Sequence, residues 1–300
     1  MKQACISSRW MLASMFTLLV PAMSWANGTE TVAVGPQYDT THVYVEHGTL
    51  NSFTNSILKT FGGTASKPVL VNVTPTPSKT YSQLIHTPSG IFSVFDFQTP
   101  IPYPFGVERN GFLVKDMKEA IEQAKKVGAD VLVEPFNDPI GRDAVIQWPG
   151  GVNMQLYWHT TAPEYKKQTF IPENRVYLSE HRVEDFLKSY QAFSHGTIVS
   201  DSRVSNKVIG LDGQNSIRQI RLDSTFGKTR IFVTDGHLPY PFGRELTGYA
   251  VSDLQETLDK ASDSGAKILW RSSNAEKEAS ALVQFPGGYI AEIHPAARQI

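Results

Sequence analysis

The sequence predicts an α+β fold made of two tandem copies of one domain, each copy being a pair of βαβββ modules. The first observation is that PYPFG occurs twice, at 102–106 and at 239–243, which are 239 − 102 = 137 positions apart. The second is that the agreement between the copies extends outward from this motif in both directions. The third is that alternating strand patterns and helix-end signals recur in the same order around both copies. Together these observations indicate a duplicated domain.

Downstream of the repeated motif, the two copies match at the shift of 137. GFLVKDMKEAIEQAKKVGADVL from Gly111 aligns with GYAVSDLQETLDKASDSGAKIL from Gly248, and AVIQWPGG aligns with ALVQFPGG. Upstream the shift is 175 − 42 = 133, because VYVEHG after His42 resembles VYLSEH after Arg175. The second copy therefore holds 137 − 133 = 4 extra residues, which we place in a loop between 197 and 218, where added length costs little free energy.

Each element of the first copy has a local signal. THVYVE alternates as a strand, GTLNSFTNSILKTFGG is a helix that ends at glycine, and PVLVNV, YSQLIH and IFSVFDF follow as three strands. After PYPFG, whose prolines favour a linker between modules, the order recurs as strand GFLV, a helix over 116–127, and strands VLVEPF, AVIQW and MQLYW. Asp116 and Asp253 are predicted helix N-caps, and Gly128 and Gly265 are predicted to end those helices with a positive φ.

The first 26 residues are predicted to be a secretory signal peptide. Arg9 provides a basic start, WMLASMFTLLV forms a short apolar core, and SWA ends at Ala26 with small residues suited to cleavage. We expect a periplasmic or secreted protein with no membrane anchor after cleavage. The single cysteine, Cys5, lies in this segment, so the mature chain is expected to lack disulfides.

The composition limits the function classes. Hydrophobic residues make up 41% and charged residues 19% of the chain, which suits globular domains with sizeable cores. A formal net charge of −1 without a basic run argues against nucleic acid or an anionic membrane as partner. Motifs of covalent catalysis and nucleotide binding, such as G-x-S-x-G, the P-loop and the Rossmann glycines, are absent from the sequence. A small molecule is the expected partner.

The strand followed by GTL…FGG, the V-x-D-(M/L) step into a helix and the PGG…(Q/E)-(L/I) ending resemble the vicinal oxygen chelate superfamily, which includes glyoxalase I, bleomycin resistance proteins and extradiol dioxygenases. The resemblance covers two predicted glyoxalase-like domains, at 38–160 and 172–296. It implies that each pair of βαβββ modules forms a half-barrel with its helices outside, and that the inner face holds a divalent metal or a ligand. Because this fold hosts isomerases, transferases, oxygenases and binding proteins, the resemblance does not specify a reaction.

The resemblance places the metal positions of the first copy at His42, Asp96, Arg109 and Gln155. We expect strand alternation to bring them to one face, where His42, Asp96 and Gln155 could hold iron, manganese, nickel or zinc. Arg109 cannot be a ligand, because a guanidinium is always charged, and we expect it to pair with Asp96 and leave the site metal-free. The predicted small-molecule site consists of Tyr44, Arg109, Asn153, Gln155 and Tyr157.

The second copy carries Arg175, Val233, Leu246 and Glu292 at the four metal positions. Two of these are apolar, and the other two have opposite charge. We expect a structural ion pair between Arg175 and Glu292, because a buried carboxylate needs a partner.

Two functions remain open on the sequence. The first is a metal-assisted lyase, isomerase or oxygenase, in which a metal held by His42, Asp96 and Gln155 acts as a Lewis acid. The alternative is a non-catalytic, metal-free protein that binds or sequesters a small molecule. Retention of His42 favours the first, and replacement of metal ligands in both copies favours the second.

Overall fold

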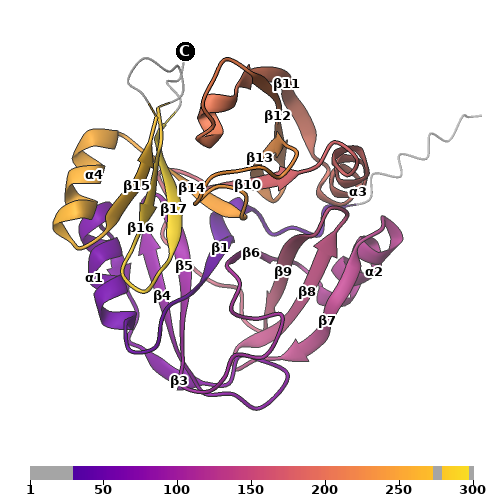
Figure 1. The fold of residues 1–300 in the computed structure, drawn as a ribbon. Coiled ribbons are helices and arrows are strands. Elements are labelled where there is room, and N and C mark those ends of the chain that lie inside the picture. Colours follow the sequence, from indigo (N-terminus) through magenta and orange to yellow (C-terminus); the bar gives the residue numbers. More distant parts are fainter. Residues whose placement is uncertain (1–29, 273–278, 297–300) are drawn as a thin grey trace, which may run out of the picture. The chain divides into compact units, whose positions relative to one another are not determined.

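The computed structural model describes residues 30–272 and 279–296, and Figure 1 shows their arrangement. The predicted signal peptide lies outside the described residues. Four α-helices are described, and none of them is long and apolar enough to cross a membrane. They are α1 (Leu50–Phe61), α2 (Met117–Lys126), α3 (Val183–Ser194) and α4 (Leu254–Asp263).

The first sheet is formed by one continuous stretch of chain. Its strands are β1 (Thr40–Tyr44), β2 (Thr64–Ala65), β3 (Val69–Val71), β4 (Thr80–Thr87), β5 (Gly90–Phe97), β6 (Arg109–Leu113), β7 (Asp130–Asn137), β8 (Gly141–Trp148) and β9 (Val152–His159). The order is β2-β4-β5-β1-β6-β9-β8-β7, with β3 paired to β4. β1 is parallel to β5 and β6 is parallel to β9, while β1 and β6 meet antiparallel where the two modules join.

The second sheet repeats this topology. Its strands are β10 (Glu173–Leu178), β11 (Thr197–Ser205), β12 (Ser216–Ser224), β13 (Gly227–Val233), β14 (Leu246–Val251), β15 (Lys267–Arg271), β16 (Ala281–Gln284) and β17 (Ile290–Pro295). The order β11-β12-β13-β10-β14-β17-β16-β15 matches the first sheet position by position. A short 3-10 helix, η2 (Asn206–Ile209), lies between β11 and β12, in the segment predicted to hold the extra residues. The predicted α+β fold of two tandem glyoxalase-like domains is confirmed.

The ends of α2 and α4 form as predicted. The Asp116 carboxylate accepts a hydrogen bond from the Glu119 backbone N–H at 2.8 Å, and Asp253 accepts the equivalent bond from Glu256 at 2.9 Å. After the helices the chain leaves through Gly128 and Gly265, with φ of +99° and +91°. The local chemistry of both helix ends is therefore conserved between the copies of this chain.

The two PYPFG segments are equivalent linkers. One joins β5 to β6 and the other joins β13 to β14, so each connects the two modules of its copy. Both contain a cis peptide bond, Tyr103–Pro104 and Tyr240–Pro241. The same five residues therefore share this cis peptide bond in both copies.

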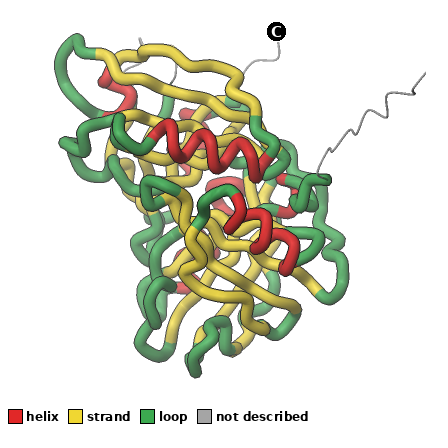
Figure 2. The backbone as a smooth tube through the Cα atoms, turned by 90° about the vertical axis from the view of Figure 1, so that its right-hand side faces the viewer, coloured by secondary structure: helices red, strands yellow, loops and turns green. Residues whose placement is uncertain are grey.

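Each helix of the first copy shares a hydrophobic core with a helix of the second. α1 and α4 lie side by side, and Phe53 and Leu258 belong to one buried cluster; Ala120 of α2 and Phe186 of α3 belong to another. Figure 2 shows the helices lying against the strands. Burying one such large side chain contributes about 1.5–3 kcal/mol. Since these cores occupy the helix side of each sheet, the opposite faces remain for other side chains.

Candidate functional site

The first sheet curves around a cavity of about 190 Å³ on the face opposite its helices. His42 and Tyr44 on β1 lie beside Ser93 and Phe95 on β5 in the strand register, and all four contribute to the wall. The other lining residues are Thr40, Val69, Val71, Val73, Ser82, Leu84, Phe105, Asp138, Pro139, Ile140, Asp143, Gln155, Tyr157, His159 and Tyr165. The cavity is therefore the inside of the predicted half-barrel.

His42 is held in its uncharged form within this wall. Its side chain is 5% exposed and packs over Gly111, where an added Cβ would lie 2.1 Å from the imidazole Cε1. The ring stacks on Phe95, with 5.5 Å between ring centroids. Burial, and then the positive charge of Arg109, lower the pKa of His42 to about 3. Gly111 is thus required for the position of His42, and the imidazole is neutral at physiological pH.

Arg109 is buried next to the cavity, and its position differs from the prediction. The side chain is 2% exposed. Its Nε and Nη2 each donate a hydrogen bond to the Val107 backbone carbonyl at 3.3 Å, and Nη2 also donates to the backbone carbonyl of Pro104. Its guanidinium carbon lies 5.9 Å from the ring centre of Tyr44 and 5.6 Å from that of Phe105, and both rings line the cavity. Among the described residues Nη1 has no hydrogen-bond partner. The expected ion pair between Arg109 and Asp96 is not formed in the described structure, because Arg109 donates to backbone carbonyls instead.

The expectation that Asp96 shares the inner face with His42 is wrong. Side chains alternate along β5, so Phe95 and Asp96 point to opposite sides of the sheet. The Asp96 carboxylate instead accepts hydrogen bonds from the Gly48 backbone N–H at 3.0 Å and from Gln98 Nε2 at 2.8 Å, and lies 3.2 Å from His47 Nδ1. Two of these partners, His47 and Gly48, precede α1, where free N–H groups and the helix dipole favour an anion.

Gln155 and Tyr157 lie in the wall as predicted, whereas Asn153 does not. The Gln155 side chain is 3% exposed, and its Oε1 has no partner among the described residues. The Tyr157 hydroxyl donates a hydrogen bond to the backbone carbonyl of Tyr38. Asn153 is engaged elsewhere: its Oδ1 accepts a bond from Gln147 at 2.9 Å, and its backbone N–H donates to a carboxylate of the second copy. The prediction of Asn153 as a ligand-binding residue is therefore not supported by its contacts.

Several lining residues were missed by the sequence reasoning. Asp143 on β8 lies across from Tyr157 on β9; burial, and then the charge of Asp138, raise its pKa well above the ordinary range, although a hydrogen bond from Gln155 opposes the shift. Its face could have been found from alternation along β8 once β9 had been paired with it. Tyr165 comes from the segment between the copies, and its local sequence carries no signal for a role in the cavity.

The residues at the four family metal positions do not form a donor set for a divalent ion. His42 and Gln155 lie in the cavity wall, but Arg109 places a permanent cation beside them and Asp96 lies on the other face of the sheet. One neutral imidazole and one amide oxygen next to a guanidinium are a poor match for a divalent cation. Within the described residues, no group of three His, Cys, Asp or Glu side chains is arranged to hold a metal.

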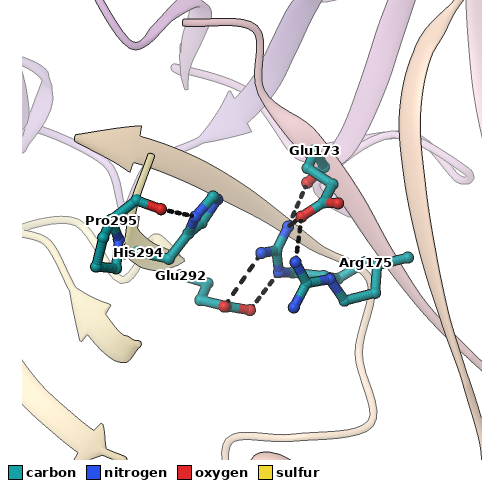
Figure 3. A network of polar contacts seen from close by, with 6 residues as sticks. Glu173, Arg175, Glu292, His294 and Pro295 are labelled. Carbon is teal, nitrogen blue, oxygen red and sulfur yellow. Dashed lines mark hydrogen bonds and ion pairs between the residues drawn. The ribbon is translucent and has the colours of Figure 1, made fainter. Parts of the chain in front are cut away.

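The second half-barrel contains a chain of charged side chains (Figure 3). Arg175, 0% exposed, donates to the Glu292 carboxylate through Nε and through Nη2 at 3.1 Å, so the predicted pair is in contact. Arg175 Nη1 lies 2.8 Å from Glu173 Oε2, which is also 3.1 Å from Arg230 Nη2. Burial raises the pKa of Glu292, but Arg175 and Arg230 outweigh it, and the net pKa is lowered. Gly248 provides the space, since an added Cβ would lie 2.0 Å from Arg175 Nη1.

Comparison with known proteins identifies the fold and nothing finer. The chain matches no protein-family model and no curated protein sequence. Among solved structures, it is similar to a mutant of 4-hydroxymandelate synthase from Streptomyces coelicolor, with TM-score 0.59 and 13% identity over 89% of this chain and 94% of that one. It is also similar to a variant of homoprotocatechuate 2,3-dioxygenase from Brevibacterium fuscum, with TM-score 0.52 and 11% identity over 89% of this chain and 72% of that one. A third similar structure is 2,2',3-trihydroxybiphenyl 1,2-dioxygenase from Sphingomonas wittichii, with TM-score 0.50 and 10% identity over 89% of this chain and 91% of that one. The chain therefore has the fold of the vicinal oxygen chelate superfamily, in its tandem two-domain form.

Proposed function

We propose that this chain is an exported protein that binds a small organic molecule in the first half-barrel without a resident metal. The observation that carries the proposal is a cavity whose wall contains three buried polar atoms without a hydrogen-bond partner among the described residues: Thr40 Oγ1, His42 Nδ1 and Gln155 Oε1. An unsatisfied buried polar group costs about 1–3 kcal/mol. A ligand that supplies hydrogen-bond partners at this wall would recover part of that free energy.

The donor chemistry supports binding without a metal. The interior is lined mainly by aromatic and aliphatic side chains, which is typical of small-molecule sites with a few polar groups. At the metal positions, Arg109 places a permanent positive charge beside His42, and Asp96 is hydrogen-bonded on the opposite face. The metal-assisted lyase, isomerase or oxygenase is therefore the less favoured function.

The second copy has a structural role in this proposal. The Glu292–Arg175–Glu173–Arg230 chain occupies the inner face that corresponds to the cavity of the first copy. Export rests on the signal-like segment at 1–26. It is tested by N-terminal sequencing of the protein from the periplasm or medium, which we expect to begin near Asn27.

Binding is tested with the purified mature chain and a panel of single-ring organic compounds, screened by ligand-observed NMR and measured by calorimetry. Ser93→Phe places a ring in the cavity beside His42, whereas Ser202→Phe makes the same change on an exposed strand of the second copy. We expect compounds to bind the wild type and Ser202→Phe, and to bind Ser93→Phe at least tenfold more weakly. Equal binding to all three proteins would place the ligand elsewhere and overturn the proposal.

The metal alternative is tested on the same protein after stripping. Manganese, iron, nickel and zinc are titrated by calorimetry with and without His42→Ala. We expect no stoichiometric tight binding that depends on His42. Tight binding abolished by His42→Ala would support the metal-assisted enzyme instead.

A further inference from the structure

We propose that the first half-barrel selects an uncharged, single-ring organic molecule that carries a hydrogen-bond donor, and that it discriminates against anions and cations of the same shape. This inference rests on the proposed function and names its ligand class. It is argued from the size of the cavity, the chemistry of its wall and the charges around it.

The size of the cavity suits a ligand of one ring. Its volume is about 190 Å³, and apolar protein cavities of about 150 Å³ accommodate benzene. One aromatic ring with a short side group therefore fills the available space. The rings of Tyr44, Phe95, Phe105 and Tyr157 surround it, and aromatic pairs in edge or offset contact contribute about 0.5–1.5 kcal/mol beyond buried area.

The wall has no cation to receive an anion. Neither Lys nor Arg occurs among the lining residues that the structure describes, whereas Asp138 and Asp143 both do. Arg109 is outside the lining and 2% exposed; its Nε and Nη2 are hydrogen-bonded to backbone carbonyls, and its Nη1, which has no partner among the described residues, is buried. A carboxylate in the cavity would lose its hydration and face two carboxyl groups.

A cation is also poorly accommodated. Burial, and then the charge of Asp138, raise the pKa of Asp143 well above its ordinary range, which favours the neutral form of its carboxyl group. Asp138 Oδ1 already accepts a hydrogen bond from the Ile140 backbone N–H at 3.1 Å. Arg109 adds a positive potential behind the wall and is, after burial, the second cause of the lowered pKa of His42. A cation in the cavity would therefore lose its hydration and also meet the repulsion of Arg109.

The unpartnered groups specify a donor on the ligand. Gln155 Oε1 can only accept a hydrogen bond, and Thr40 Oγ1 can accept one as well. Both residues line the cavity and are at least nine-tenths buried, with 3% and 5% exposure. An N–H or O–H of an amide, alcohol or phenol is the group that would satisfy them.

The test uses three probes of one shape that differ in charge at pH 7: phenylacetamide, phenylacetate and phenethylamine. Each is titrated into the mature wild-type chain by calorimetry, with ligand-observed NMR for weak binding. We expect phenylacetamide to bind at least tenfold more tightly than either charged probe. Gln155→Leu should weaken phenylacetamide binding about tenfold, whereas Gln123→Leu, a change at a half-buried position of α2 away from the cavity, should leave it unchanged.

Other outcomes overturn the ligand class in identifiable ways. Tighter binding of phenylacetate, lost in Arg109→Met and retained in Arg109→Lys, would show an anion site. Tighter binding of phenethylamine, lost in Asp138→Asn, would show a cation site. If none of the probes binds while other single-ring compounds bind in a manner abolished by Ser93→Phe, the ligand class is wrong and the proposed function stands. If no compound shows binding sensitive to Ser93→Phe, the proposed function itself fails.

Discussion

The two half-barrels have the same topology, but their interiors are filled differently. The first encloses a cavity, whereas the second contains a chain of buried ion pairs. The difference arises at equivalent positions: His42 corresponds to Arg175, Arg109 to Leu246, and Gln155 to Glu292. The imidazole of His42 ends close to β1 and leaves space in front of it. The extended side chain of Arg175, with its two carboxylate partners, spans the equivalent space of the second copy. Three side chains therefore change the inner face without changing the scaffold.

One feature of the strands is common to both interiors. Gly111 in the first copy and Gly248 in the second lie under the side chain of the opening strand, that of His42 or Arg175. An added methyl group would meet that side chain at 2.1 Å or 2.0 Å. Both copies thus keep a glycine that leaves room for this side chain, and only the side chain differs between them.

The largest expected effect comes from breaking the ion pair of the second copy. Glu292→Gln should lower the free energy of unfolding by about 3–5 kcal/mol, because Arg175 is then left buried with only part of its charge compensated. Denaturant unfolding of the mature chain measures the loss. The double variant Arg175→Met, Glu292→Leu should recover most of it, since Glu173 still contacts Arg230. A Glu292→Gln protein as stable as the wild type would show that this network contributes little.

The second effect concerns two acids that link the copies. Glu108 and Glu245 occupy equivalent positions, 245 − 108 = 137, and each reaches the other copy: Glu245 Oε1 accepts a hydrogen bond from the Asn153 backbone at 3.0 Å, and Glu108 is hydrogen-bonded by Tyr289. Burial raises the pKa of Glu245 from 4.5 to about 7, against the opposing influence of Asn153 and Arg109. The folded protein therefore retains a proton that the unfolded chain releases near pH 4.5.

The sign of the pH effect follows from that raised pKa. The stabilisation is fully present below about pH 4.5 and is lost as the pH rises through about 7, a difference of roughly 3 kcal/mol for Glu245. Between pH 5 and pH 8, the free energy of unfolding should fall more for the wild type than for Glu245→Gln, whose side chain cannot ionise. Parallel pH profiles for the two proteins would remove Glu245 as the titrating group.

The third effect tests the shared glycines. Gly111→Ala should cost about 1–3 kcal/mol, because the rigid imidazole of His42 must move. Adding His42→Ala should relieve most of this loss, so a double-mutant cycle measures the coupling. Gly248→Ala should cost more than Gly111→Ala, because it also displaces an Arg175 head group fixed by Glu173 and Glu292. Equal losses would mean that the ion network tolerates the shift.

The smallest effect should be the same in both copies. Asp116→Ala and Asp253→Ala each remove one N-cap hydrogen bond and should each cost about 1 kcal/mol. Thermal unfolding of the two variants provides the measurement. Losses that differ by more than about 1 kcal/mol would show that the local equivalence of α2 and α4 does not extend to their energetics.

The sequence by itself determined the duplication, the order of the elements and the ends of the helices. These features depend on neighbours within a few residues: Asp116 caps a helix through Glu119, and Gly128 adopts a positive φ that other residues avoid. The ion pair of Arg175 and Glu292 could also be predicted, because both positions follow from strand equivalence and two buried opposite charges attract.

Only the tertiary structure decided which groups surround the cavity. The Asp96 side chain lies on the helix side of the sheet, where the Gly48 N–H ahead of α1 donates to its carboxylate. The Arg109 guanidinium donates hydrogen bonds to backbone carbonyls of the linker that precedes β6. Tyr165 lines the cavity from the segment between the copies, and Asp143 faces it through the pairing of β8 with β9. The physical reason is that capping and alternation act over a few residues, whereas the choice between two faces of a sheet depends on burial and on partners that only the complete fold brings together.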